Sequence, residues 1–455
     1  MAHYLDFTDG TFTVASSTNI FLTEYTPQTP ATRYEQIKGV SDGGELGAAY
    51  YDNVTETVEG AMYTSSFQSN YVVLQRLMEA AKERQRTRTG AKVYIRYQID
   101  GSSDIYRSEI LTGRVELVKG AMSIWGNQHL PIRIHITRRY FWEHVDETEL
   151  QLASQASGTP ATGGKTIHNH KDSGQGNYVE IAAAQVVGAI PAPVRIRLQN
   201  NTGSTQDYRN VYLAVNANSS PSTFSHIIEG ENFDAGGVGA PVSNSTNSSD
   251  AYVSGSFNTT GDYFKWVLSA GLLSVTRGRW FRLMARFHGY SAQAYVRPII
   301  LDNDGFISLY RGDEVLLPAS QTELIDLGMV PLPPAGYDSA AGAHMLGLYC
   351  RSVSGSATLN LDFIQLTPVE SYRHLVMRGN DVANGDAIED DGPEGRAYHD
   401  LAGAHHYIMS PRGASLTVFP NLIQRIYVLH DEGFSANIDN SFLVRAYYRP
   451  RRLTI

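Results

Sequence analysis

The fold of this chain is decided by YVVLQRLMEAAKERQRTR at residues 71–88 and by LPIRIHIT at residues 130–137. In the second stretch isoleucines alternate with polar residues, which is typical of a strand with one buried face. In the first stretch the apolar side chains recur at the spacing of one helix face, namely Leu74, Leu77, Met78 and Ala81. The two patterns together predict a sheet covered by a helix on one side and polar on the other.

The neighbouring residues extend this helix-and-sheet prediction. Ser69 and Asn70 stand where an N-cap should accept the unpaired N–H groups of the first helical turn. Alternation over residues 93–99 predicts a strand, and residues 107–119 predict a second one, with Gly113 as a bulge or bend.

Length and composition limit the class of protein. A chain of 455 residues exceeds the size at which single cores stop growing, so we expect two or three domains. Charged residues are only 18%, whereas Gly occurs 41 times and Tyr 27 times. This composition indicates a mostly β protein with many turns.

Charge and cysteine content exclude several functions. The formal charge of −9 and the pI near 5.9 argue against a protein that binds nucleic acid through its phosphates. The single cysteine, Cys350, excludes an internal disulfide framework and a cysteine-rich zinc site. We expect neither export through a signal peptide nor a membrane span, because no run approaches ~18 apolar residues.

The first third of the chain resembles a known family. Short strands, one helix, and a long pair of strands ending in Tyr140, Phe141 and Trp142 resemble the ring-forming domain of distal tail proteins from long-tailed bacteriophages, over residues 1 to about 145. The resemblance implies a hexameric ring in the virion tail, assembled in the host cytoplasm. It implies a tail-tube protein and a tail-tip hub protein as partners.

The remaining residues predict further β domains. We expect a tail-tube-like β-barrel or sandwich with one α-helix at residues 1–148, and a linker of small polar residues at 149–176. Residues 177–222 and 371–455 are predicted to form one split β-sandwich around an insert at 223–370. The resemblance implies that the split sandwich is galectin-like.

The insert has a resemblance of its own. The Glu229-x-Glu231 strand and the closing run ATLNLDFIQL at residues 357–366 resemble jelly-roll carbohydrate-binding modules. This implies that Glu229, Glu231 and Asp362 hold a structural calcium, since calcium prefers oxygen ligands. No other cofactor is expected.

Aromatic residues in the insert are candidate sugar contacts, because an aromatic face suits the C–H face of a pyranose. The candidates are Tyr263, Tyr290 and Trp266. Tyr263 and Tyr290 lie next to Gly and polar residues, which favours the surface. Trp266 and Trp280 lie in apolar strands, which favours the core.

Other motifs carry less weight. The triplet at 168–170 spells His-Asn-His without the frame of a nuclease, and the run at 302–305 lacks the closing glutamate of a calcium loop. A further group of possible metal ligands, which a solvated surface loop explains more simply, consists of His399, Asp400, His405 and His406. No Gly-x-Ser-x-Gly is present, and Cys350 is expected to be buried and inert.

The sequence therefore predicts a non-enzyme, a virion structural protein of a phage tail tip or baseplate. Its ring would join the tail tube to the tip complex, and its outer domains would contribute to attachment to host-surface glycans. The alternative is a soluble carbohydrate-binding protein or an accessory module of a polysaccharide-degrading system. An enzyme with an unrecognised site is a third hypothesis.

Overall fold

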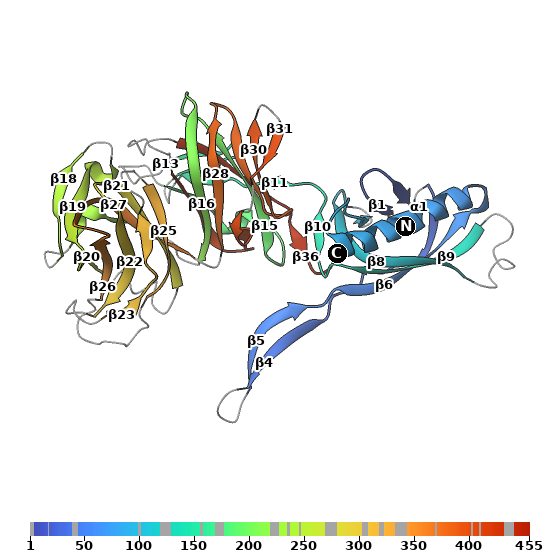
Figure 1. Cartoon of the computed structure of the whole chain (residues 1–455). Helices are drawn as coiled ribbons and strands as arrows, with labels where there is room; N and C mark the ends of the chain where they lie inside the picture. The colour runs from blue at the N-terminus through green and yellow to red at the C-terminus, as the bar shows by residue number, and fades with distance from the viewer. Residues whose placement is uncertain are drawn as a thin grey trace. The chain divides into compact units, whose positions relative to one another are not determined.

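A computed structural model gives the fold of the chain (Figure 1). It divides into two compact units: unit 1 is Met1–Thr148, Val187–Pro191 and Arg449–Ile455, and unit 2 is Glu149–Val186 and Ala192–Tyr448. The residues that the structure describes are 4–16, 18–38, 44–98, 102–118, 129–154, 158–168, 177–218, 227–233, 237–244, 247–268, 280–302, 308–317, 323–332, 344–368, 371–401, 404–408, 411–431 and 441–455.

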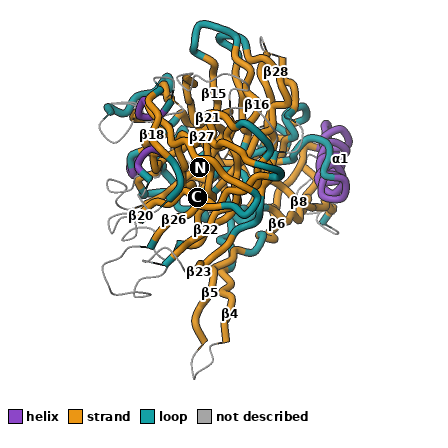
Figure 2. The backbone as a smooth tube through the Cα atoms, turned by 60° about the vertical axis from the view of Figure 1, so that its left-hand side comes forward, coloured by secondary structure: helices purple, strands orange, loops and turns teal. Residues whose placement is uncertain are grey.

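The fold is mainly β, as predicted, and its described residues contain a single α-helix (Figure 2). In unit 1 a nearly closed, barrel-like antiparallel sheet runs in the order β2-β1-β7-β8-β9-β6-β3. Its strands are β1 (Tyr4–Thr8), β2 (Thr13–Ala15), β3 (Ile20–Glu24), β6 (Val54–Tyr63), β7 (Tyr94–Gln98), β8 (Ile105–Leu117) and β9 (His129–Arg138).

Helix α1 (Phe67–Thr87) covers one face of this sheet and contacts β8 most (Figure 1). Its buried side chains are the four predicted from periodicity, and they share one apolar core with Ile132, Ile134 and Ile136 of β9. The predicted N-cap is wrong. The helix begins earlier, after Ser66, whose hydroxyl accepts a hydrogen bond from the side chain of Asn70.

Gly113 is not the site of the bulge in β8. The register shift lies between Ile110 and Thr112. A Cβ atom at Gly113 would lie 2.3 Å from the sulfur of Met78. A larger residue at this position would displace the side chain of Met78, because the helix packs closely on the sheet here.

Unit 1 is completed by residues distant in sequence. Strand β10 (Trp142–His144) pairs with β36 (Arg451–Arg452), and Ala189 donates a backbone hydrogen bond to Arg451. Residues 449–455 were predicted to belong to the second sandwich. They join unit 1 instead, where Ile455 packs against the apolar core.

Unit 2 contains two β-sandwiches. In the first, an eight-stranded sheet follows the order β11-β35-β15-β29-β30-β31, with β13 on β35 and β33 on β15. Its strands are β11 (Thr148–Glu149), β13 (Lys165–His168), β15 (Ala192–Asn200), β29 (Ala387–Asp391), β30 (Arg396–Leu401), β31 (Ala404–Tyr407), β33 (Thr417–Val418) and β35 (Ser441–Tyr448).

The facing sheet has six strands in the order β12-β14-β34-β16-β28-β32. They are β12 (Leu152–Ser154), β14 (Tyr178–Ile181), β16 (Gln206–Asn218), β28 (Tyr372–Val382), β32 (Arg412–Gly413) and β34 (Ile423–Asp431). The range 149–176 is thus not only a linker, because Leu152 of β12 and Ile167 of β13 fill the core of this sandwich. Residues 155–157 and 169–176 lie outside the described residues.

The second sandwich comes from the predicted insert. Its larger sheet has the order β18-β19-β27-β21-β25, with β17 on β27, and its smaller sheet β20-β26-β22-β23, with β24 on β22. The strands are β17 (Ile227–Glu229), β18 (Ala240–Ser243), β19 (Ala251–Asn258), β20 (Asp262–Val267), β21 (Trp280–Tyr290), β22 (Ala294–Leu301), β23 (Ser308–Arg311), β24 (Val315–Leu317), β25 (Glu323–Pro331), β26 (Met345–Ser352) and β27 (Ser356–Pro368).

Candidate functional site

One hairpin of unit 1 pairs with no other described strand. Strands β4 (Thr32–Lys38) and β5 (Gly44–Tyr51) form a two-stranded sheet of their own, which extends away from the barrel-like sheet (Figure 1). Isolated two-stranded hairpins are marginally stable in water, and exposed strand edges are templates for pairing with another chain. The hairpin is therefore a candidate docking element.

The face of the unit 1 sheet opposite α1 is polar. Register places Thr57 beside His135, and His135 beside Arg114. Thr57 Oγ1 lies 3.0 Å from Nδ1 of His135, whose Nε2 lies 2.9 Å from Oε1 of Glu116. The hydrogen bond from His135 lowers the pKa of Glu116.

A second row crosses the same polar face. Glu59 and Glu116 flank Arg133 in the register of β6, β9 and β8, and Arg133 Nη2 lies 2.7 Å from Oε1 of Glu59. On the other side of the Thr57–His135 row, the hydroxyls of Thr55 and Thr137 lie 3.0 Å apart. The face thus carries mutually compensated charges, which suits solvent or a polar partner better than a tightly bound polyanion.

A buried ion pair fixes β6 to β9 at the end of this sheet. Arg138 Nε donates to Oε1 of Glu56 at 2.7 Å, with both side chains at most 1% exposed. The guanidinium also lies 4.4 Å from the ring centre of Trp142, which is fully buried. The hydroxyl of Tyr25 donates to the same Glu56 oxygen at 2.7 Å.

The three carboxylates expected to hold calcium do not form a ligand set. Asp362 accepts a hydrogen bond from Arg286 in a buried ion pair, so its charge is already compensated. Over the described ranges, no group of three or more His, Cys, Asp or Glu side chains could hold a metal ion. Asp362 is thus engaged by an arginine, whereas a calcium held by Glu229 and Glu231 together with main-chain oxygens stays a prediction.

Glu229 and Glu231 remain close enough for the charge of one to affect the other. Burial, with a smaller contribution from the charge of Glu229, raises the pKa of Glu231 to about 7. A folded-state pKa above the ordinary value of 4.5 gives stability that is fully present below pH 4.5. That stability is lost as the pH rises through 7.

We therefore expect Glu231→Gln to be more stable than the wild type at pH 8, by about 1 kcal/mol after allowing for partial solvent screening. At pH 5 the two proteins should differ little, because Glu231 is then neutral. Urea unfolding at both pH values measures this. Glu79→Gln, on the exposed face of α1, is the control. An equal effect of Glu231→Gln at the two pH values would contradict the prediction.

The aromatic candidates in the insert are distributed differently from the prediction. Trp266 is 1% exposed, as expected for a core residue, and its indole N–H donates to the carbonyl of Glu229. Tyr290 is also buried, at 5% exposed, so it is not the surface residue predicted. Tyr263 is half-buried and lies beside Tyr349, with ring centres 5.3 Å apart.

Trp280, predicted to be in the core, is 47% exposed. Both Trp280 and Tyr290 lie on β21, whose register against β25 and β27 shifts at several points. Each bulge changes which face the following side chains occupy, so simple alternation fails along this strand.

The other motifs show no common site. His399 is buried, Asp400 pairs with Arg197 at 2.6 Å, and His405 stacks on the ring of Tyr398. Cys350 is buried, and burial raises the pKa of its thiol, as its predicted inertness requires. Most of the 168–170 and 302–305 motifs lies outside the described residues, which include only His168 and Asp302.

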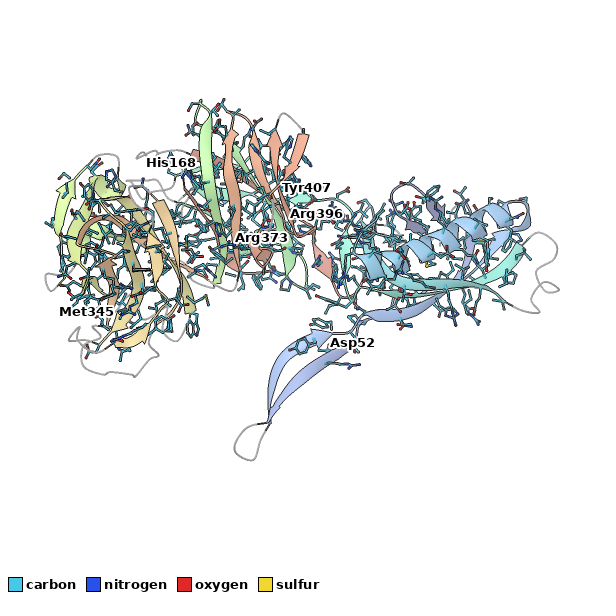
Figure 3. The ribbon with its side chains drawn as sticks, viewed as in Figure 1. Asp52, His168, Met345, Arg373, Arg396 and Tyr407 are labelled. Atoms are coloured by element: carbon cyan, nitrogen blue, oxygen red, sulfur yellow. The ribbon has the colours of Figure 1, made fainter. Side chains whose placement is uncertain are left out.

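Sequence reasoning missed one surface. On β15, β29, β30 and β31, charged and aromatic side chains share the outer face of the sheet. Tyr407 there is 65% exposed, and Figure 3 shows it next to Arg396. Local sequence marked only Asp400 and His405 of this face, as possible metal ligands. The rest of the face could not be seen, because its members come from residues 195–197 and 389–407.

Comparisons with known proteins give only loose likenesses. No family model matches the chain, and no curated protein matches it. A chain of the phage P2 baseplate in its activated conformation with calcium is 8% identical, with both chains covered in full and a TM-score of 0.33. The Dit protein of phage SPP1 is 8% identical over 80% of this chain and 99% of its own, with a TM-score of 0.28.

A cycloalternan-forming enzyme from Listeria monocytogenes, solved with a pentasaccharide substrate, is also 8% identical. It covers 77% of this chain and 30% of its own length, with a TM-score of 0.20. TM-scores this low establish neither a shared fold nor a family. Among the described residues, no helix is long and apolar enough to cross a membrane.

Proposed function

We propose that this chain is a structural subunit of a phage tail tip, whose unit 1 self-associates into a hexameric ring that joins the tail tube to the tip complex. A tail-tube protein and a tail-tip hub protein would be its neighbours in the virion, after assembly in the host cytoplasm. Unit 2 would contribute contacts to host-surface glycans. The proposal includes no catalytic role.

The observation that carries the proposal is the β4–β5 hairpin. A hairpin that pairs with no other described strand of its own chain gains stability when a second copy covers it. Strands β2 and β3 also end the barrel-like sheet at either side, and each has an edge that pairs with no other described strand and could meet a neighbouring subunit. Repetition of one interface around a closed ring satisfies such edges in every copy.

We expect replacement of residues 34–49 by a short Gly-Ser linker to abolish the oligomer. The remaining sheet should fold, because the hairpin forms a sheet separate from it. Native mass spectrometry of the full-length protein and the variant measures the oligomer, and circular dichroism with thermal unfolding checks that the variant is folded. Tyr407→Ala, which changes an exposed ring of unit 2, is the matched control and should leave the oligomer intact.

A folded deletion variant that still forms the wild-type oligomer would overturn the role of the hairpin. A wild-type chain that stays monomeric at high concentration, even with a tail-tube protein, would overturn the ring. Sugar binding by such a monomer would favour the second candidate, a soluble carbohydrate-binding protein. That candidate is supported by the exposed Trp280 and Tyr407.

A further inference from the structure

The surface that carries this inference is the outer face of the sheet at β15, β29, β30 and β31, here called the β29–β31 face. Strand register places one residue of each strand in a single row: Arg197, Glu389, Tyr398 and Tyr407. Residues directly opposite in neighbouring strands point to the same side of a sheet, so this row forms a continuous strip.

The polar groups of the β29–β31 face are fixed by one another. The carboxylate of Glu389 accepts hydrogen bonds from Arg195 at 2.5 Å, Arg197 at 3.0 Å and the hydroxyl of Tyr398 at 2.7 Å. Arg197 also donates to Asp400 at 2.6 Å. Groups held this way lose little conformational freedom when a ligand binds.

The electrostatics of Glu389 agree with this geometry. Burial alone would raise the pKa of its carboxyl, but hydrogen bonds from Tyr398 and Arg195 lower the pKa below its ordinary value. The carboxylate therefore stays charged at neutral pH, and its two arginines keep defined orientations.

Beside this polar network, aromatic rings run from the buried Tyr398 to the exposed Tyr407. Tyr407 is 65% exposed, and its ring centre lies 5.8 Å from the guanidinium carbon of Arg396. The ring of Tyr398 stacks on His405 with centres 4.1 Å apart, and meets Tyr407 edge to face at 6.5 Å. Figure 3 shows Tyr407 and Arg396 side by side at the β30–β31 hairpin.

The balance of charge and apolar area selects the kind of partner. Arg195 and Arg197 are compensated by Glu389 and Asp400, and Asp391 stands opposite Arg396 in the strand register. The face therefore offers no excess positive charge for a polyanion. One exposed ring among charged groups is too little apolar area for a typical protein interface core. A sugar-binding site requires hydrogen-bonding side chains in fixed positions and an aromatic ring face for the C–H groups of the sugar. The arginines and Tyr407 of the β29–β31 face provide both.

We propose that the β29–β31 face binds a neutral oligosaccharide, with Tyr407 stacked on a sugar ring and the guanidinium groups of Arg195 and Arg197, held in place by the buried Glu389, hydrogen-bonded to its hydroxyls. This inference rests on the glycan contact of the proposed function and makes it more specific, because it assigns that contact to the split sandwich and not to the insert. Sugar binding at this face does not depend on ring assembly. Calorimetry can therefore contradict the sugar site while native mass spectrometry still shows the ring, and the reverse can also occur.

The test is isothermal titration calorimetry of the full-length protein with three probes: maltohexaose, cellohexaose and the tetramer of N-acetylglucosamine. We expect at least one to bind with a Kd on the order of 1 mM. Tyr407→Ala should weaken that binding about tenfold, whereas Tyr407→Phe should keep most of it, because the ring face remains. Trp280→Ala is the matched control, an exposed aromatic of the insert, and should change the Kd by less than about twofold.

Three results would overturn the proposal. One is that none of the three probes binds at 10 mM, a concentration about ten times the expected Kd. Another is binding that Tyr407→Ala leaves unchanged. The last is binding lost in Trp280→Ala but kept in Tyr407→Ala, which would move the sugar site to the insert. Tyr407 is exposed, so circular dichroism of its variants should match the wild type and exclude loss of fold as the cause.

Discussion

Replacement of Glu56 by alanine is expected to lower the free energy of unfolding by about 3–5 kcal/mol. Glu56 and Arg138 are the partners of an ion pair with side chains at most 1% exposed. Removing the carboxylate leaves the guanidinium buried without its counter-charge, which costs far more than the loss of one hydrogen bond. It also removes the acceptor of the Tyr25 hydroxyl. Urea unfolding followed by tryptophan fluorescence measures the effect, since Trp142 lies against Arg138.

Glu59→Ala is the matched control for this experiment. Glu59 lies on the same strand and pairs with Arg133 at 2.7 Å, but the two side chains are 43% and 38% exposed. Exposed ion pairs contribute less than about 1 kcal/mol, so this variant should remain close to the wild type. Equal losses in the two variants would show that the Glu56 pair is not the anchor described here.

Asp362→Ala is expected to cost about 3–5 kcal/mol by the same mechanism in the insert. Asp362 is fully buried, and its partner Arg286 is 5% exposed. Because the partner is an arginine and not a metal ion, the loss should be the same in calcium and in a chelator. Thermal unfolding of both proteins under the two conditions tests this.

The control for Asp362 is Glu314→Ala, which removes an exposed pair with Arg351 and should cost less than about 1 kcal/mol. A wild-type melting temperature that rises in calcium, with no such rise in Asp362→Ala, would contradict the arginine pairing. It would favour the calcium ligand that the resemblance implied.

Local pattern was sufficient to predict the layers of unit 1. The helix spacing of Leu74 and Ala81, and the alternation of Ile132 and Ile134, each repeat within a few residues, and the structure confirms both buried faces. The helix start was not predictable in this way. Ser69 and Ser66 have equal capping chemistry, and the helix follows directly on a 3-10 turn at Thr64–Ser66, which local composition does not mark.

The exposure of aromatic residues could not be predicted by alternation. Trp280 and Tyr290 are even-numbered positions of one strand, yet one is exposed and the other buried. The register shifts along β21 depend on pairing with β25 and β27, which are distant in sequence. Residues 149–176 were misassigned for a related reason, since single apolar residues such as Leu152 and Ile167 define their place only in the assembled core.

The row of residues across the candidate binding face could not be predicted from the sequence, because it depends on the register between strands that are distant in the chain. Arg197 and Glu389 are separated by 192 positions and meet only when β15 pairs with β29. The ion pair of Asp362 with Arg286 was hidden in the same way, and a motif match alone assigned Asp362 to a metal. Where chemistry is carried by cross-strand pairs, composition and spacing cannot identify it.

The return of residues 449–455 to unit 1 has a consequence for synthesis. Strand β10 finds its partner β36 only after all of unit 2 has left the ribosome. Chains fold domain by domain as they emerge, so unit 1 would wait, partly formed, through the translation of about 300 further residues. A chain interrupted before that point lacks the closing strand, and such a truncated product would be excluded from any assembly that requires a finished unit 1.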